Sequence, residues 1–181
     1  MRDNGKLAES ASVAAEAGSR DSFKETTIRA TVHKYWAGES EPYEVIECEP
    51  GNLLTYGGAS AFWDLLTGGG TQTAFNNANA YIGVGENAGA AVIGSTDLLG
   101  ATLKRNAMEA TYPLHTDGET IGAEDCVFKA SFATGEANFA WEEWGVFNAA
   151  AAGRMLQRKA ESLGTKTSAA VWTLTVTLSI S

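Results

Sequence analysis

Apolar and polar residues alternate most regularly at the C-terminal end of the chain, where every second position from Trp172 to Ile180 is apolar. The intervening positions carry mainly threonine and serine. Because successive side chains of a strand point to opposite faces of a sheet, this run predicts a half-buried antiparallel strand. The same period of two predicts strands at residues 26–36 and 126–133, the first of which is rich in β-branched residues.

Shorter segments extend this β pattern. Further strands are expected at residues 43–49, 80–84, 141–147 and 154–160. Residues 104–112 fit a strand or a helix, and we favour a strand because Tyr112-Pro113 ends the segment. Residues 97–101 are expected to form one turn of helix. Strands separated by glycine-rich and polar turns, together with one longer helix, predict a mainly β antiparallel sandwich or barrel-like domain.

The longer helix is expected within residues 51–70, at about 52–67. An apolar stripe runs through this segment, formed by Leu53, Leu54, Phe62, Trp63, Leu65 and Leu66. Ser60 is a possible N-cap for a shorter helix, and the three glycines at 68–70 provide a C-terminal stop. Trp63 is expected to anchor the helix against the rest of the domain.

Residues 1–25 differ in character from the rest of the chain. Leu7 and Val13 are the only large aliphatic residues between Arg2 and Ser22, and the remainder is rich in alanine, serine, glycine and charge. Such a composition buries too little apolar surface to fold alone. We therefore expect an N-terminal extended arm that orders on a neighbouring subunit, followed by a single β-rich structural domain at residues 26–181.

Charge is distributed unevenly along the 181 residues, whose formal net charge is −9. Residues 35–103 contain eight acidic side chains and no lysine, arginine or histidine, and residues 51–103 contain only three charges in all. A segment with so little charge is expected to be buried or packed against other subunits, which favours a homo-oligomer. A trimer is our expectation. The acidic balance argues against a nucleic-acid partner.

No apolar run is long enough to span a bilayer, and the N-terminus lacks the continuous apolar stretch of a secretory signal. We therefore expect no membrane partner and no secretion. We expect the protein to be assembled in a cytoplasm. Cys48 and Cys126 lack the spacing of a zinc site. They are expected to be reduced thiols, although a disulfide between them remains open.

Candidate catalytic residues are sparse. Nothing in the sequence ties His33 or His115 to a nucleophile, and no GxSxG motif is present. Glu142 and Glu143 are adjacent, so in a strand they point to opposite faces. Glu142 with Asp125 is the best available pair for acid–base chemistry.

Two glycine-containing motifs depart from nucleotide-binding signatures. The GVG at residues 83–85 lacks the third glycine and the following helix of a dinucleotide site, and the GTKTS at residues 164–168 precedes a strand instead of following one. No catalytic, cofactor or metal site is therefore expected. The residues expected to matter for assembly and packing are Trp63, Trp141, Trp144 and Trp172.

Four segments, taken in order, carry a family resemblance. They are NLLTYGGASAFWDLLTGGG, AYIGVGENAGAAVIGSTDLLGA, FKASFATGEANFAWEEWGVFNA and GRMLQRKAESLGTKTSAAVWTLTVTLSIS. Together they resemble a family of tailed-bacteriophage virion structural proteins, over residues 51–181. Related C-terminal endings also occur in proteins of tail-fibre and tail-collar type.

This resemblance implies a β-rich, oligomeric, non-enzymatic protein of the virion that is assembled in the host cytoplasm. A capsid decoration protein bound to the major capsid protein is our first expectation. A minor tail or tail-fibre-associated protein that binds other tail proteins is the alternative. A glycan-degrading virion enzyme is a third hypothesis, and it would need the carboxylates of Glu142 and Asp125 in one cleft.

Overall fold

The computed structural model describes residues 26–49, 51 and 53–180. The N-terminal arm expected at residues 1–25 lies outside the described residues. The elements in chain order are β1 (Thr27–Trp36), β2 (Glu44–Glu47), β3 (Leu53–Leu54), α1 (Tyr56–Thr67), β4 (Tyr81–Gly85), β5 (Leu103–Ala107), β6 (Leu114–His115), β7 (Asp125–Phe132), β8 (Ala140–Phe147), β9 (Met155–Thr165) and β10 (Ala170–Ser179).

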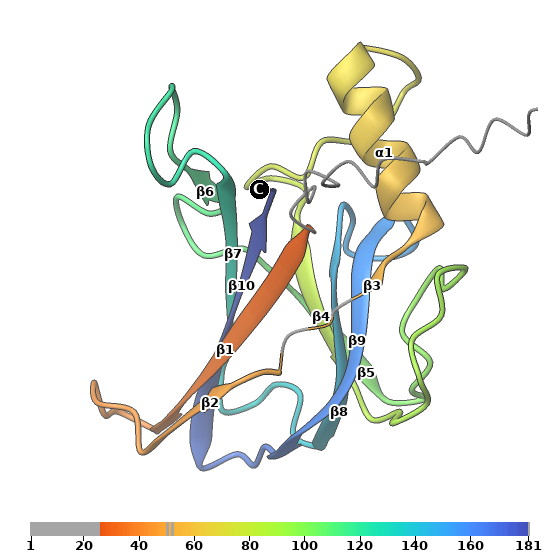
Figure 1. The fold of residues 1–181 in the computed structure, drawn as a ribbon. Helices are drawn as coiled ribbons and strands as arrows, with labels where there is room; N and C mark the ends of the chain where they lie inside the picture. Colours follow the sequence, from red (N-terminus) through yellow and green to blue (C-terminus); the bar gives the residue numbers. More distant parts are fainter. Residues whose placement is uncertain (1–25, 50, 52, 181) are drawn as a thin grey trace, which may run out of the picture.

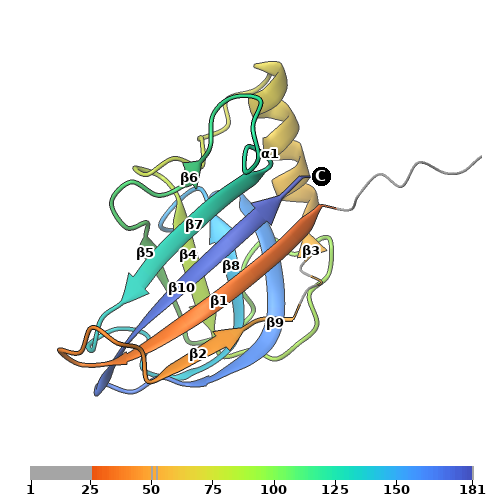
Figure 2. The ribbon, with the colours of Figure 1, turned by 60° about the vertical axis from the view of Figure 1, so that its left-hand side comes forward.

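The strands of the described residues form two antiparallel sheets that face each other (Figures 1 and 2). One sheet has the order β2-β1-β10-β7-β6, and the other has the order β3-β9-β8-β4-β5. The core between them contains fully buried residues of both sheets, including Val32, Phe132 and Leu174 from the first and Ile82 and Trp144 from the second. The mainly β, antiparallel sandwich predicted from the sequence is confirmed.

The two ends of the sandwich domain meet in one sheet, because β1 pairs along its whole length with β10. The register runs from Thr27 opposite Ser179 to Trp36 opposite Ala170. The side chains of Val32 and Leu174 lie opposite each other and point into the core, as the period of two in both segments predicts.

Several predicted boundaries are wrong. Strand β9 continues to Thr165, beyond the expected end at residue 160, because a register shift between Trp141 and Glu143 lets β8 pair with it as far as Ala140 opposite Thr165. Strand β2 is shorter than the expected 43–49. Strand β5 ends at Ala107 instead of residue 112, before a turn in which Thr111 has a positive φ. Residues 97–101 form no helical turn.

The helix begins at Tyr56, later than the expected residue 52, because Leu53 and Leu54 pair with β9 as strand β3. Thr55, not Ser60, is the N-cap: its Oγ1 accepts a hydrogen bond from the Gly58 amide at 3.0 Å and donates one to the Met155 carbonyl at 2.6 Å. Gly68 ends the helix in the left-handed conformation, as the glycine run predicts.

Candidate interaction surface

The four tryptophans singled out in the sequence lie in two different environments. Trp141, Trp144 and Trp172 are at most 2% exposed and belong to the core between the sheets. The ring of Trp141 makes edge-to-face contacts with Trp172 and with Phe132, each with a centroid separation of 4.8 Å. Trp63 is 58% exposed, so the expectation that it anchors the helix is wrong.

Gly58 and Ala61 are the buried residues of α1. A Cβ on Gly58 would lie 2.1 Å from the Leu156 carbonyl oxygen, so the helix backbone lies directly on β9 at this point. An apolar pattern along a helix cannot predict this arrangement. The helix approaches β9 at a glycine, which has no side chain, and the large apolar residues lie on the other faces of α1.

The low-charge segment therefore exposes apolar side chains. Tyr56, Trp63 and Leu66 of α1 are 66%, 58% and 65% exposed, and Val92 and Ile93 of the β4–β5 loop are 59% and 43% exposed. The Tyr56 amide donates a hydrogen bond to the Ile93 carbonyl at 2.8 Å, which joins the start of the helix to the loop. We call these five residues the helix–loop surface.

The helical part of this surface extends away from the sandwich. In both ribbon views, the N-terminal end of α1 lies at the sheet edge and its C-terminal half projects beyond the strands (Figures 1 and 2). Within the segment 51–103, which carries three charges, the single charged residue of the helix is Asp64. The sequence predicts that this segment is buried or packed against other subunits. Within this chain the segment is only partly buried, since several of its large apolar side chains are exposed.

A buried ion pair bonds the backbone of the β4–β5 loop at two places. Glu143 of β8 and Arg158 of β9 are both fully buried, and Arg158 Nε donates to Glu143 Oε2 at 2.7 Å. The Glu143 carboxylate also accepts hydrogen bonds from the Leu99 and Gly100 amides at 2.6–3.0 Å. Arg158 Nη2 donates to the Gly89 carbonyl at 2.9 Å. The pair therefore holds both ends of the loop segment 89–100.

A second arginine anchors the end of the same loop. Arg105 Nη2 lies 2.6 Å from Asp97 Oδ1, and Arg105 Nη1 donates to the Ala149 and Ala152 carbonyls. Its guanidinium lies 3.5 Å from the centroid of the Phe147 ring. Together, the two arginines hold a loop with exposed apolar residues in one conformation, and such preorganisation lowers the entropy cost of association.

The sequence missed the role of Glu143. The adjacent pair Glu142-Glu143 was expected to point to opposite faces, and it does, but the sequence does not show that one face is covered by a loop. The feature of the sequence that relates to this buried acid is the presence of two glycines, Gly85 and Gly100. A Cβ on either one would lie within about 3 Å of the Glu143 carboxylate. Two distant glycines thus make room for one buried acid.

The proposed acid–base pair is not assembled. Glu142 lies on β8 and accepts a hydrogen bond from Ser162 Oγ at 2.9 Å, whereas Asp125 lies on β7 in the other sheet and accepts one from Ser179 Oγ. His33 stacks on Tyr35 along β1, with a centroid separation of 6.4 Å. These contacts give each residue a separate partner within its own sheet.

The two glycine-containing motifs have structural roles. Gly83 and Gly85 lie inside β4, where a Cβ on Gly83 would be 2.8 Å from the Phe147 ring. Lys166 of GTKTS is buried, and its Nζ donates to the Ala133 carbonyl at 2.7 Å and to Asn138 Oδ1 at 3.0 Å. Burial lowers the pKa of this ammonium group. Lys166 thereby fixes the turn between β7 and β8.

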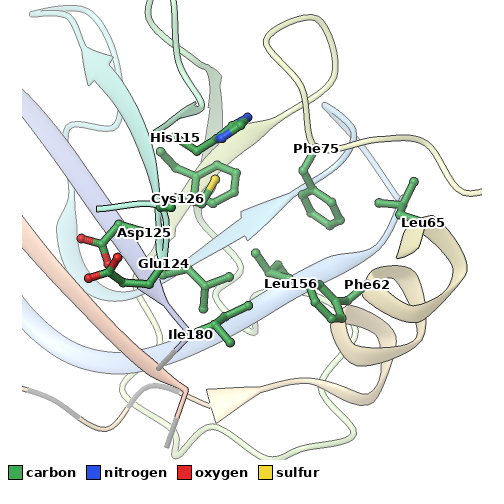
Figure 3. A pocket seen from close by; sticks show the side chains of 12 residues that line it. Phe62, Leu65, Phe75, His115, Glu124, Asp125, Cys126, Leu156 and Ile180 are labelled. Carbon is green, nitrogen blue, oxygen red and sulfur yellow. The ribbon is translucent and has the colours of Figure 1, made fainter. Parts of the chain in front are cut away.

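A second feature is an apolar groove between α1 and the ends of β7, β9 and β10 (Figure 3). It has a volume of about 370 Å³. Its lining residues are Phe62, Leu65, Phe75, His115, Ala123, Glu124, Asp125, Cys126, Phe128, Leu156, Leu178 and Ile180. The aromatic and aliphatic side chains point toward one another across it, and Glu124 and Asp125 lie at one side.

Both cysteines are free thiols. Cys48 is buried, and this burial, with a further contribution from the Glu161 carboxylate, raises the pKa of its thiol to about 12. Burial also raises the pKa of Cys126. Since the thiolate is the reactive form, both thiols are expected to be poor nucleophiles at neutral pH.

The Cys48 pKa predicts a loss of stability in alkali. The unfolded thiol ionises near its ordinary pKa of 9.0, and the folded thiol near 12, so the unfolded state releases its proton first as the pH rises. The free energy of unfolding should therefore fall more steeply above pH 9 in the native protein than in Cys48→Ala. Urea titrations at pH 8 and pH 10 measure this difference, and equal slopes in the two proteins would contradict it.

Within the described ranges, no three His, Cys, Asp or Glu side chains gather as a metal site, and no helix is long and apolar enough to cross a membrane. The fold and the surface define a β-sandwich that presents an apolar helix and a preorganised loop. Comparison of the chain with protein-family models, with curated proteins and with solved structures finds no match.

Proposed function

We propose that this chain is a non-enzymatic structural subunit of a bacteriophage particle, a capsid decoration protein that assembles as a homo-oligomer. The observation that carries the proposal is the helix–loop surface. Its five apolar residues are exposed, within a segment that has three charges in 53 residues. Large apolar side chains exposed in this way are typical of surfaces that contact other proteins.

The buried charges support a structural role over a catalytic one. Glu143 and Arg158 bond each other and the loop backbone, so their burial contributes to the shape of the surface. The resemblance of four segments to virion structural proteins supplies the phage assignment, with a trimer in the virion, after assembly in the host cytoplasm, as its expected form. The major capsid protein is the proposed partner.

A tail location is the second candidate. The C-terminal run, which forms β9 and β10, resembles endings that also occur in tail-fibre and tail-collar proteins. A minor tail or tail-fibre-associated protein would use the same surface against other tail proteins. Labelled antibody on intact virions of the phage that encodes the chain separates the two locations, since the signal falls on heads or on tails.

The double substitution Trp63→Ser and Leu66→Ser is expected to weaken self-association at least about tenfold in dissociation constant, because exposed large apolar anchors dominate interfaces. Sedimentation equilibrium over a range of concentrations measures the change. Val45→Ser is the matched control: Val45 is 46% exposed but lies on β2, away from α1.

The control protein should associate like the native one. A native chain that stays monomeric at every concentration, and that sediments with neither phage heads nor tails, would overturn the proposed function. Equal weakening by both sets of substitutions would place the contact elsewhere on the molecule.

A further inference from the structure

The apolar groove continues into a second cavity, and the two run along the end of the sandwich. The second cavity has a volume of about 210 Å³ and shares four lining residues with the first: Phe62, Leu156, Leu178 and Ile180. It is also lined by Thr26, the first described residue of the chain. The chain thus enters the sandwich beside the second cavity.

The strand register fixes the direction from which the chain arrives. Thr27 of β1 lies opposite Ser179 of β10, so Thr26 lies beside Ile180, which lines both cavities. Phe23 is three residues before Thr26, and three residues span at most about 11 Å between Cα atoms. An aromatic side chain at this position is within reach of the groove.

The sequence just before Thr26 matches the groove in chemistry. Phe23 is the one aromatic residue among residues 1–25, and the charges around it balance, with Arg20 and Lys24 against Asp21 and Glu25. The groove offers an apolar lining, and the carboxylate oxygens of Glu124 and Asp125 point away from it, toward Gly122 and Ser179 (Figure 3). Among the described residues, neither cavity is lined by a lysine or arginine. An aromatic side chain is therefore complementary to the apolar lining of this site.

We propose that the groove is the docking site for residues 20–24 of the same chain, with the Phe23 side chain among the apolar residues of the first cavity, beside Cys126. The same chain is favoured over a second copy because a three-residue connection gives a very high effective concentration of Phe23 at the groove. The proposal goes beyond the virion role and does not depend on it.

Cys126 provides a native reporter for this docking. Its side chain lines the groove and is partly exposed in the described residues. Docked Phe23 would cover the thiol and slow its alkylation by iodoacetamide. In the full-length chain, Phe23→Asp should raise the alkylation rate of Cys126 about tenfold or more, as expected when burial of one aromatic side chain is lost. Peptide mass spectrometry distinguishes this thiol from Cys48.

Two further variants make the test specific. Val13→Asp places the same charge elsewhere in residues 1–25 and should leave the rate unchanged, whereas Phe23→Leu keeps an apolar side chain and should retain most of the protection. Protection in the native protein should also be independent of protein concentration. Equal rates for Phe23→Asp and the native chain would overturn the docking, and protection that disappears on dilution would assign the groove to a second copy.

Discussion

Glu143→Gln is expected to lower the free energy of unfolding by about 3–5 kcal/mol, the usual cost of removing one partner of a buried ion pair. The substitution leaves the fully buried Arg158 without a counter-charge. It also replaces the carboxylate that accepts the Leu99 and Gly100 amides with a group that has a single acceptor oxygen. Urea unfolding measures the loss, and hydrogen exchange at these two amides should accelerate.

Glu142→Gln is the matched control, since it makes the same change one residue away. Glu142 points to the opposite face of β8 and accepts a hydrogen bond from Ser162 Oγ at 2.9 Å, so the expected cost is below about 1 kcal/mol. If the two variants had equal stabilities, the ion pair would not hold the loop. Glu143→Gln should also weaken self-association, because the loop that presents Val92 and Ile93 would lose its anchor.

Trp172→Ala is expected to cost about 3–5 kcal/mol, the range for removing a buried tryptophan from a core. Trp172 is 2% exposed, and its ring contacts Trp141 at a centroid separation of 4.8 Å. Lys34 Nζ lies 4.2 Å from the centroid of the Trp172 ring, and Trp172 Nε1 donates to Tyr43 Oη at 3.2 Å. The substitution removes all of these contacts, and the cavity falls between the two sheets.

Trp36→Ala tests the same substitution at the surface. Trp36 is 51% exposed and stacks on Tyr43 at a centroid separation of 4.3 Å, so about 1 kcal/mol is expected. Thermal or urea unfolding of both variants gives the comparison. A Trp172→Ala protein as stable as the native chain would mean that β10 does not contribute to the core, contrary to the structure.

The sequence predicted the strands well where alternation is long. In β1, β7 and β10 the period of two identified both the strand and its buried face, since the direction of each side chain depends only on its own backbone. The glycine run correctly predicted the end of α1 at Gly68. The prediction was wrong in a short segment. Residues 97–101 were expected to form a helical turn, but the amides of Leu99 and Gly100 donate hydrogen bonds to the Glu143 carboxylate instead.

The candidate surface was only half visible in the sequence. The scarcity of charge in residues 51–103 indicated a segment made for contact, and the structure exposes Tyr56, Trp63 and Leu66 from it. The face of α1 that meets the sandwich depends on Gly58, where a Cβ would lie 2.1 Å from the Leu156 carbonyl oxygen. Leu156 belongs to β9, so this close approach cannot be read from the helix sequence. This is why Trp63 was expected to be an anchor and is instead exposed.

By itself, the sequence determined the β class, the faces of the long strands and the uneven distribution of charge, because local periodicity and composition set these features. The tertiary structure decided which residues meet across the chain. It brought Glu143 to Arg158 and to Gly100, and it placed Thr26 beside Ile180 at the groove. Pairing between distant strands fixes such contacts, and no local pattern encodes which strands will pair or in what register.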